Sequence, residues 1–414
     1  MLPDTSNDVD PEFIAIVLAG SIGTRLYPFT NEHHPKHLLP IAGSPLLHRL
    51  LHTLGTGCGF QETIVVIAPD DVVTIPSIRE QLPEFVPTSS TSCGTSTTTT
   101  SSATTTTHLA SPTMRLTLLQ PTASSCGPTA AFLAAWAERP TSHAVVLPGD
   151  LVVTDPSVLR AWIHAHRKSN WNVTKNNDGD TTKVLRTACT MLLTDCGTSD
   201  HVPLKESAKQ KKGLYARDEE EREYIAIAST STSSGEGSHN HRVVWKQSVL
   251  DITEDGVGGT PRLVLPKARL RTTHTTTSTT IRIRTDWNDV HCYCFAPWVH
   301  ERLREEWETE TTVASSLKED VLPWLLEWQW RGFVDNDNID DTSEFAVRAY
   351  TVDPAHSVFR AHTVPLCFLP TSAPFLLTCL RQSIRTATLY LRSPSATKVL
   401  STLVPRHPAT RQLR

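Results

Sequence analysis

The sequence of 414 residues lacks long apolar runs and carries little net charge. No uninterrupted apolar segment reaches the ~20 residues that a helix needs to cross a bilayer, so we expect no membrane span. The formal charge of −4 is slight for this length and indicates neither a nucleic-acid-binding surface nor a polybasic membrane patch. The stretch from Met1 to Pro11 has neither a basic start nor an apolar run, so we expect no secretory signal.

The nine cysteines are an odd number and show no repeated paired spacing. A disulfide framework or a zinc site would need such pairs, so this pattern favours free thiols. Free thiols fit a reducing compartment, and we expect a cytosolic protein. The length allows a large core, with one main domain and a smaller second piece.

One stretch carries most of the information, Phe13 to Pro40, with the sequence FIAIVLAGSIGTRLYPFTNEHHPKHLLP. Its first part is branched and apolar, which predicts a strand buried on both faces. The following Gly20 and Gly23 can bring backbone N–H groups close to an anion, because glycine has no Cβ and tolerates positive φ. Arg25 and Lys36 follow the loop at short range in the sequence. The loop and the segment that carries these two cations can therefore face one phosphate-bearing ligand. The same glycines also suit an ordinary strand-to-helix turn.

Further apolar segments extend the pattern. A leucine stripe within residues 46–54 predicts a helix, and Glu62 to Ala68 predicts a second buried strand, which together make a right-handed parallel unit. Another buried strand begins at His143 and ends in Gly-Asp, with Asp150 at its carboxyl end. An acidic residue there lies at the crevice where such sheets bind ligands. Asp150 can equally cap the turn that follows it.

Two histidines on the predicted helix, His48 and His52, lie one helical turn apart. No Asp or Glu accompanies them in a zinc-protease arrangement, so a polar helix face is the favoured interpretation.

The composition changes twice along the chain. Residues 87–113 are rich in Ser and Thr and have almost nothing to bury, so we expect a disordered insertion. Residues 197–241 form a second insertion with charged and polar blocks. We therefore expect a disordered leader over 1–12, one domain over 13–346 interrupted by these insertions, and a tail of uncertain structure over 347–414. No hexapeptide repeats of a left-handed β-helix are readable in that tail.

The string LAGSIGTRLYPFT followed by PKHLLP closely resembles the signature of the sugar-nucleotide pyrophosphorylases, Leu-Ala-Gly-Gly-x-Gly-Thr-Arg-Leu-x-Pro-Leu-Thr followed by Pro-Lys-Pro-Leu-Leu-Pro. The resemblance implies an α/β, Rossmann-like, three-layer nucleotidyltransferase-like domain with a mixed, mostly parallel sheet. It also implies that the glycine loop contacts a nucleotide and that the two cations neutralise its phosphates. The matching nucleotide-binding positions are Leu18, Ala19, Gly20, Gly23 and Thr24, and the matching cations are Arg25 and Lys36.

Two later segments carry further implied roles. Asp150 matches the aspartate that holds Mg²⁺ against the phosphates in these enzymes. Gly127 and Thr129 match the Gly-Thr-Ala segment beside the nucleotide base, although Pro128 between them is equally compatible with a plain helix start. The sequence also departs from the enzymes, because Ser21 replaces a glycine and no Val-Glu-Lys-Pro segment is found. Asp286 and Asp289 are candidates for a second metal ligand without the usual neighbours.

A second resemblance runs from Asp289 to Leu326, where Asp-x-His-x-Tyr-Cys leads to Ser-Ser-Leu-Lys-Glu-Asp-Val-Leu-Pro-Trp-Leu. This order is similar to the end of the corresponding domain in the gamma subunits of translation initiation factor 2B, which belong to the same superfamily. It implies a subunit that acts in assembly, with Arg25 and Lys36 vestigial, no required cofactor and no independent activity. The implied partners are an epsilon-type subunit, the other subunits of the factor and initiation factor 2, which the factor reloads with GTP; neither DNA nor a membrane is implied.

The alternative implied by the first resemblance is a working sugar-1-phosphate nucleotidyltransferase, similar to mannose-1-phosphate guanylyltransferases. In that case a nucleotide and Mg²⁺ would occupy the crevice. Catalysis would then depend on positioning and charge stabilisation.

Overall fold

The structure is a computed structural model of the whole chain. It describes residues 12–21, 23, 30–31, 34–41, 43–82, 86–87, 99–101, 104–110, 114–121, 128–171, 186–195, 223–230, 240–248, 279–309, 316–331, 345–352 and 358–360. No helix within these ranges is long and apolar enough to cross a membrane.

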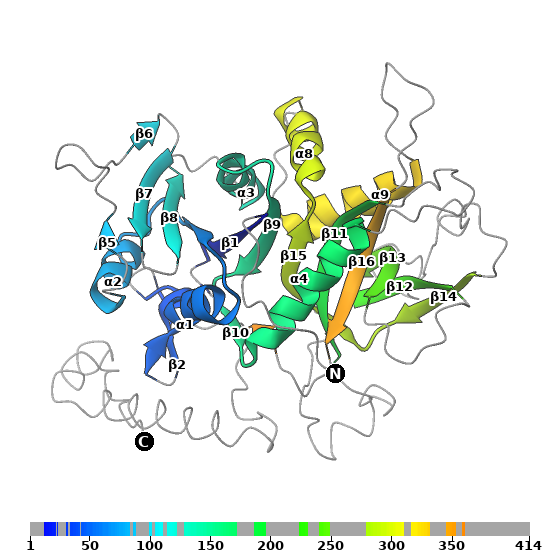
Figure 1. Cartoon of the computed structure of the whole chain (residues 1–414), viewed down its shortest axis with the longest axis horizontal. Helices are drawn as coiled ribbons and strands as arrows, with labels where there is room; N and C mark the ends of the chain where they lie inside the picture. Colours follow the sequence, from blue (N-terminus) through cyan, green and yellow to red (C-terminus); the bar gives the residue numbers. More distant parts are fainter. Residues whose placement is uncertain are drawn as a thin grey trace, which may run out of the picture.

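The centre of the fold is a group of four parallel strands in a 13-stranded sheet (Figure 1). Their order across the sheet is β8, β4, β1 and β9. β1 lies inside the sheet and is buried on both sides, as its branched apolar sequence predicts. The strands are β1 (Phe13–Ala19), β4 (Glu62–Ile67), β8 (Arg115–Pro121) and β9 (His143–Pro148).

The sheet continues beyond β9 through six further strands, in the order β15, β11, β16, β13, β12 and β14. Within this half only β11 and β16 pair in parallel. The strands are β11 (Arg186–Asp195), β12 (Glu223–Thr230), β13 (Asn240–Ser248), β14 (Thr279–Arg284), β15 (Trp287–Phe295) and β16 (Phe345–Val352).

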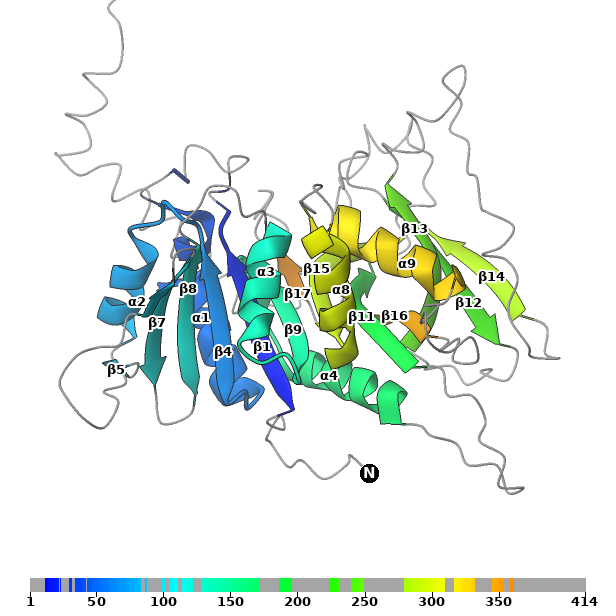
Figure 2. The same cartoon turned by 90° about the horizontal axis from the view of Figure 1, so that it is seen from above.

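Helices cover both faces of the sheet and make three layers, as Figures 1 and 2 show. Alternate residues of β1 explain the two faces: Ile14 and Ile16 join one hydrophobic cluster, while Ala15 and Val17 join the other. The first cluster is covered by α3 (Pro128–Ala137), α8 (Pro297–Thr309) and α9 (Leu322–Arg331). The second is covered by α1 (Leu46–His52), α2 (Thr74–Gln81) and α4 (Pro156–Trp171).

Short elements complete the chain and frame the crevice described below. Two hydrogen-bonded strand pairs lie outside the large sheet, β2 with β3 and β10 with β17. The elements are η2 (Lys36–Leu38), β2 (Pro40–Ile41), β3 (Ser44–Pro45), η3 (Thr53–Gly57), β10 (Leu151–Val153), η7 (Leu317–Val321) and β17 (Val358–Arg360).

The predicted mixed sheet is confirmed, but its expected parallel majority is not. Four pairings between the described strands of the large sheet are parallel and eight are antiparallel. A parallel pair needs a long crossover between its strands. Consecutive strands such as β7 and β8, or β12 and β13, are joined by fewer than a dozen residues, too few for such a crossover, and therefore pair antiparallel.

The predicted domain boundaries also need correction. The Ser/Thr-rich stretch over 87–113 contributes β6 (Thr99–Ser101) and β7 (Thr104–Ala110) to the sheet, next to β5 (Val86–Pro87). Threonine is β-branched and suits a strand when a partner such as β8 is present. The boundary at 346/347 falls inside β16. The leader over 1–11 and the tail beyond 360 lie outside the described residues.

Candidate functional site

A cavity of about 420 Å³ lies at the carboxyl ends of the four central parallel strands. Leu18, Val66 and Pro148 line it from the ends of β1, β4 and β9, and Pro121 lines it from the end of β8. The carboxyl ends of parallel strands are where α/β sheets bind ligands. This crevice is therefore the candidate functional site.

The glycine loop after β1 forms one wall of the crevice. Gly20 and Ser21 line the cavity directly. Gly23 has φ +80°, and a Cβ there would lie 2.7 Å from Lys36 Cβ, so both the backbone and the packing require glycine. Thr30 Oγ1 donates a hydrogen bond of 2.6 Å to Gly23 O, which fixes the end of the loop.

A buried ion pair joins the loop's return to the strand opposite. Lys36 Nζ lies 2.6 Å from Asp150 Oδ2, and the two side chains are 7% and 3% exposed. Asp150 follows β9 and Gly149, whose N–H donates to Leu18 O at 2.8 Å. A Cβ on Gly149 would lie 3.1 Å from Ala19 Cβ, so glycine lets β9 and β1 approach closely at this point. The result is a fixed cation and anion at the edge of the cavity.

The short helix that carries Lys36 is anchored to α2. The His37 ring nitrogen Nε2 lies 2.7 Å from Thr74 Oγ1 and 3.5 Å from Asp71 Oδ2. Burial acts to raise the pKa of Asp71, but hydrogen bonds from His37 and Thr74 outweigh it and lower that pKa to about 2. Asp71 therefore stays ionised and holds the return segment in place.

The remaining residues of the predicted site divide into three groups. Leu18, Gly20 and Asp150 line the cavity, whereas Ala19 is buried beneath it. Thr129 is buried in the first turn of α3, and its neighbours Pro128 and Ala131 form the cavity wall. The rest of the predicted set, Thr24, Arg25 and Gly127, lies outside the described residues.

The far wall of the crevice comes from β15 and η7, which the sequence analysis did not place there. It is formed by His291, Tyr293, Ser316 and Lys318. The pairing of β15 with β11 shifts register between Leu192 and Leu193, and His291 lies in the extra loop of backbone with φ 60°. A bulge of this kind re-aims a side chain, and here it directs His291 to the cavity.

A network of buried charges lies behind that wall. Lys246 Nζ lies 2.8 Å from Asp289 Oδ2 and 3.1 Å from Glu223 Oε1, and Lys318 Nζ lies 2.8 Å from the same glutamate oxygen. Tyr293 donates its hydroxyl hydrogen to Asp289 Oδ2 at 2.9 Å. Burial acts to lower the pKa of Lys246, but the two carboxylates outweigh it and raise that pKa, so the lysine stays charged.

The two candidates for a second metal ligand are both committed elsewhere. Asp289 also accepts a hydrogen bond of 2.8 Å from the His291 N–H, and the charge of Lys246 outweighs burial to hold the pKa of Asp289 well below its usual range. Asp286 forms an ion pair with Arg284. Asp289 is therefore a structural anion, and the predicted candidacy of both residues is not supported.

The described residues do not by themselves form a Mg²⁺ site. Asp150 is the one carboxylate among the residues that line the crevice, and its Oδ2 faces the Lys36 ammonium group. No group of three or more Asp, Glu, His or Cys side chains in the described ranges is arranged to hold a metal ion. Mg²⁺ in nucleotide sites is usually held by one or two carboxylates together with substrate phosphates.

Comparison with known proteins finds one matching family profile. Residues 15–218 match the profile of the MobA-like NTP transferase domain. This match and the sheet topology show that the chain contains a nucleotidyltransferase-like α/β domain, which confirms the predicted fold class. No curated protein matches the sequence.

Solved structures with a similar arrangement include three transferases. A UTP-bound UGPase from Acinetobacter baumannii is 13% identical, with 94% of this chain and 97% of that chain covered and a TM-score of 0.46. A putative glucose-1-phosphate thymidylyltransferase from Bacillus anthracis is 12% identical, with 85% and 90% covered and a TM-score of 0.45. The inositol-1-phosphate CTP transferase from T. maritima is 13% identical, with 89% and 96% covered and a TM-score of 0.45.

Proposed function

We propose that this chain is a gamma-type subunit of a guanine-nucleotide exchange factor of the translation initiation factor 2B kind, in which the nucleotidyltransferase-like domain serves assembly. One observation supports the proposal most directly. Asp150, which lines the crevice, and Asp289, which contacts the lining residue Tyr293, each form a short ion pair with a buried lysine. Charges paired in this way hold the fold together, and separating them costs several kcal/mol.

The segment that resembles gamma subunits supports the same proposal. It supplies Asp289, Tyr293 and Lys318 to the buried network, and its helix α9 packs Leu322 and Leu325 into the core beside the sheet. The resemblance from Asp289 to Leu326 thus coincides with a structural unit that joins β12, β13, β15 and η7. Such a unit stabilises a rigid surface for partner subunits.

The test is a mixing experiment with an epsilon-type subunit. The two chains, purified separately, should elute together in size-exclusion chromatography with the mass of a heteromer by light scattering. An unrelated nucleotidyltransferase of similar size, mixed at the same concentration, should elute apart from this chain. If this chain elutes alone in the presence of the epsilon-type subunit at concentrations well above micromolar, the proposed assembly role is wrong.

The second candidate function is transfer of a nucleotidyl group to a sugar 1-phosphate. The observation that favours it is the crevice itself, where a glycine-containing loop and Asp150, the ion-pair partner of Lys36, line a cavity of about 420 Å³, within the usual size of small-molecule sites. A panel of nucleoside triphosphates and sugar 1-phosphates with Mg²⁺ should then release pyrophosphate. Lys36→Gln should abolish the release, whereas replacement of the exposed Lys168 by Gln should not change it. No release from any pair of substrates would remove this candidate.

A further inference from the structure

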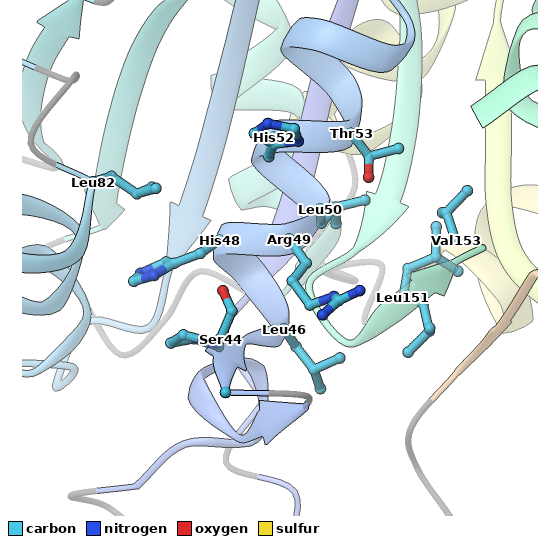
Figure 3. Close-up of a pocket in the computed structure, with 13 residues that line it drawn as sticks. Ser44, Leu46, His48, Arg49, Leu50, His52, Thr53, Leu82, Leu151 and Val153 are labelled. Atoms are coloured by element: carbon cyan, nitrogen blue, oxygen red, sulfur yellow. The ribbon is translucent and has the colours of Figure 1, made fainter. Parts of the chain in front are cut away.

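A second cavity, of about 370 Å³, lies along α1 and shares no lining residue with the crevice. Its floor is the helix from Leu46 to His52, and its walls are Leu82 on one side and β10 on the other (Figure 3). The volume lies within the range of small-molecule sites. Neither of the two proposed functions uses this cavity, which we call the α1 groove.

Three nitrogen-bearing side chains of α1 line the α1 groove: His48, Arg49 and His52. In Figure 3, His48 points toward Leu82, whereas Arg49 points toward the wall formed by Leu151 and Val153. None of the thirteen described residues that line the groove is acidic. The guanidinium of Arg49 is a cation, so this described lining carries net positive charge.

The arrangement is held by backbone and core contacts. Arg49 Nη1 donates a hydrogen bond of 3.2 Å to Ile41 O, which uses one of the five guanidinium donors. Ile41, Leu46 and Val152 form a small buried cluster beneath the groove, with Leu39 packed against it. The groove is therefore preformed, and ligand binding would not lose conformational entropy by ordering it.

The walls of the α1 groove indicate which kind of chemical group would be attached to an anion bound there. Leu82, Leu151 and Val153 are apolar, while the groove's cation and imidazoles lie along the helix. Apolar walls favour a flat or weakly polar body over a sugar with many hydroxyl groups, because buried hydroxyls need partners. A guanidinium suits the oxygen geometry of a phosphate.

We propose that the α1 groove is a binding site for a phosphate monoester with an aromatic or apolar body, of about the size of a nucleoside monophosphate. The phosphate lies against Arg49 and His52, and the body packs against Leu82 and Val153. A metal at the histidine pair of α1 would need additional ligands, which the described residues of the groove lining do not offer.

The test uses UMP as the probe, with uridine and inorganic phosphate as its two halves, and calorimetric titration of the whole chain. UMP should bind more tightly than either half. Arg49→Gln, which removes the charge, should weaken UMP binding by about tenfold or more, the usual value of a charge-assisted hydrogen bond. Val153→Phe, which fills the groove without changing a charge, should weaken it comparably.

The matched control is Arg79→Gln, because Arg79 is an exposed arginine on the neighbouring helix α2 and does not line the groove. This variant should bind UMP as the unmodified chain does, and thermal melting should confirm that all three variants fold. The proposal is overturned if the unmodified chain shows no UMP binding at millimolar concentration. It is equally overturned if folded Arg49→Gln and Val153→Phe both bind UMP unchanged, because the nucleotide then lies elsewhere.

Discussion

Lys36 Nζ lies 2.6 Å from Asp150 Oδ2, although the two residues are separated by more than a hundred positions in the sequence. This pair joins the return of the glycine loop to the end of a central strand, so it fixes the shape of the crevice. Because the two side chains are almost completely buried, each charge depends on the other for compensation.

Removing either charge should therefore destabilise the protein strongly. We expect Asp150→Asn and Lys36→Met each to lower the free energy of unfolding by about 3–5 kcal/mol, because each leaves the partner charge buried without compensation. The double variant should lose clearly less than the sum of the two single losses. Chemical denaturation of all four proteins measures this cycle, and strictly additive losses would show that the pair does not act as a unit.

Gly23 gives a second prediction about the same loop. Gly23→Ala should destabilise the protein for two reasons, the positive φ and the 2.7 Å approach of the new Cβ to Lys36 Cβ. Gly43 has nearly the same φ, +81°, but a Cβ there would meet nothing within 4 Å. Gly43→Ala should therefore cost about 1 kcal/mol from backbone strain, and Gly23→Ala should cost more. Equal losses in thermal melting would mean that Lys36 moves aside freely.

Local sequence patterns predicted one side of the crevice. The apolar run before Gly20, and the position of Asp150 after a buried strand, depend only on neighbouring residues and on the general geometry of parallel sheets. The structure accordingly brings Leu18, Gly20 and Asp150 to one cavity. No local pattern could predict that Lys36 compensates the charge of Asp150.

The other side of the crevice depends on contacts between distant segments. Glu223 and Lys246 meet because β12 pairs with β13, and Lys318 contacts the same glutamate from η7, which lies far away in the sequence. A β-bulge directs His291 to the cavity, and the amino-acid composition around it does not predict this bulge. The strand β7 was also missed, because the low hydrophobicity of its threonines outweighed their strand preference in the prediction.

The buried network supplies a prediction about pH. Asp289 is ionised in the folded protein because Lys246 lowers its pKa, so it contributes stability that is lost only as the pH falls below the ordinary carboxyl range. In Lys246→Met, Asp289 loses its principal compensating cation while Glu223 keeps its contact with Lys318, and burial then raises the pKa of Asp289 above that of the unfolded chain. The variant should therefore lose stability as the pH rises, and its deficit relative to the unmodified protein should be larger at pH 8 than at pH 5.

Denaturant unfolding at these two pH values measures the deficit. Lys168→Met, at an exposed position on α4, is the matched control and should show almost no deficit at either pH. If the deficit of Lys246→Met stays constant between pH 5 and pH 8, Lys246 does not compensate the charge of the buried carboxylates, and the prediction is wrong.

The described cysteines give a chemical prediction. Cys58, Cys189, Cys292 and Cys294 are buried thiols, and burial raises the pKa of the Cys58 thiol to about 12. Because the thiolate is the reactive form, these four should resist iodoacetamide in the native protein and react after denaturation. Peptide mass spectrometry reads each site separately, and labelling of Cys292 in the native state would contradict its buried position on β15.

A histidine pair at the other end of the central sheet should make the protein sensitive to mild acid. His143 Nδ1 lies 3.1 Å from His166 Nε2, and His166 Nδ1 lies 2.8 Å from Thr190 Oγ1. Burial, with a smaller contribution from Arg167, lowers the pKa of His143 to about 4, and burial also lowers the pKa of His166. The unfolded chain therefore binds more protons than the folded protein between about pH 6.5 and pH 4, and stability should fall as the pH falls through this window.

The pKa of His143 shifts from 6.5 to about 4 on folding. This shift corresponds to a loss of roughly 3 kcal/mol in the free energy of unfolding at the acidic end of the window. His143→Gln removes this titrating group and should make the free energy of unfolding depend less steeply on pH between 6.5 and 4. His164→Gln, at an exposed position on the helix that carries His166, should leave the slope unchanged. Because both variants remove one histidine, an equal change of slope in the two would show that burial at the pair is not the cause of the acid sensitivity.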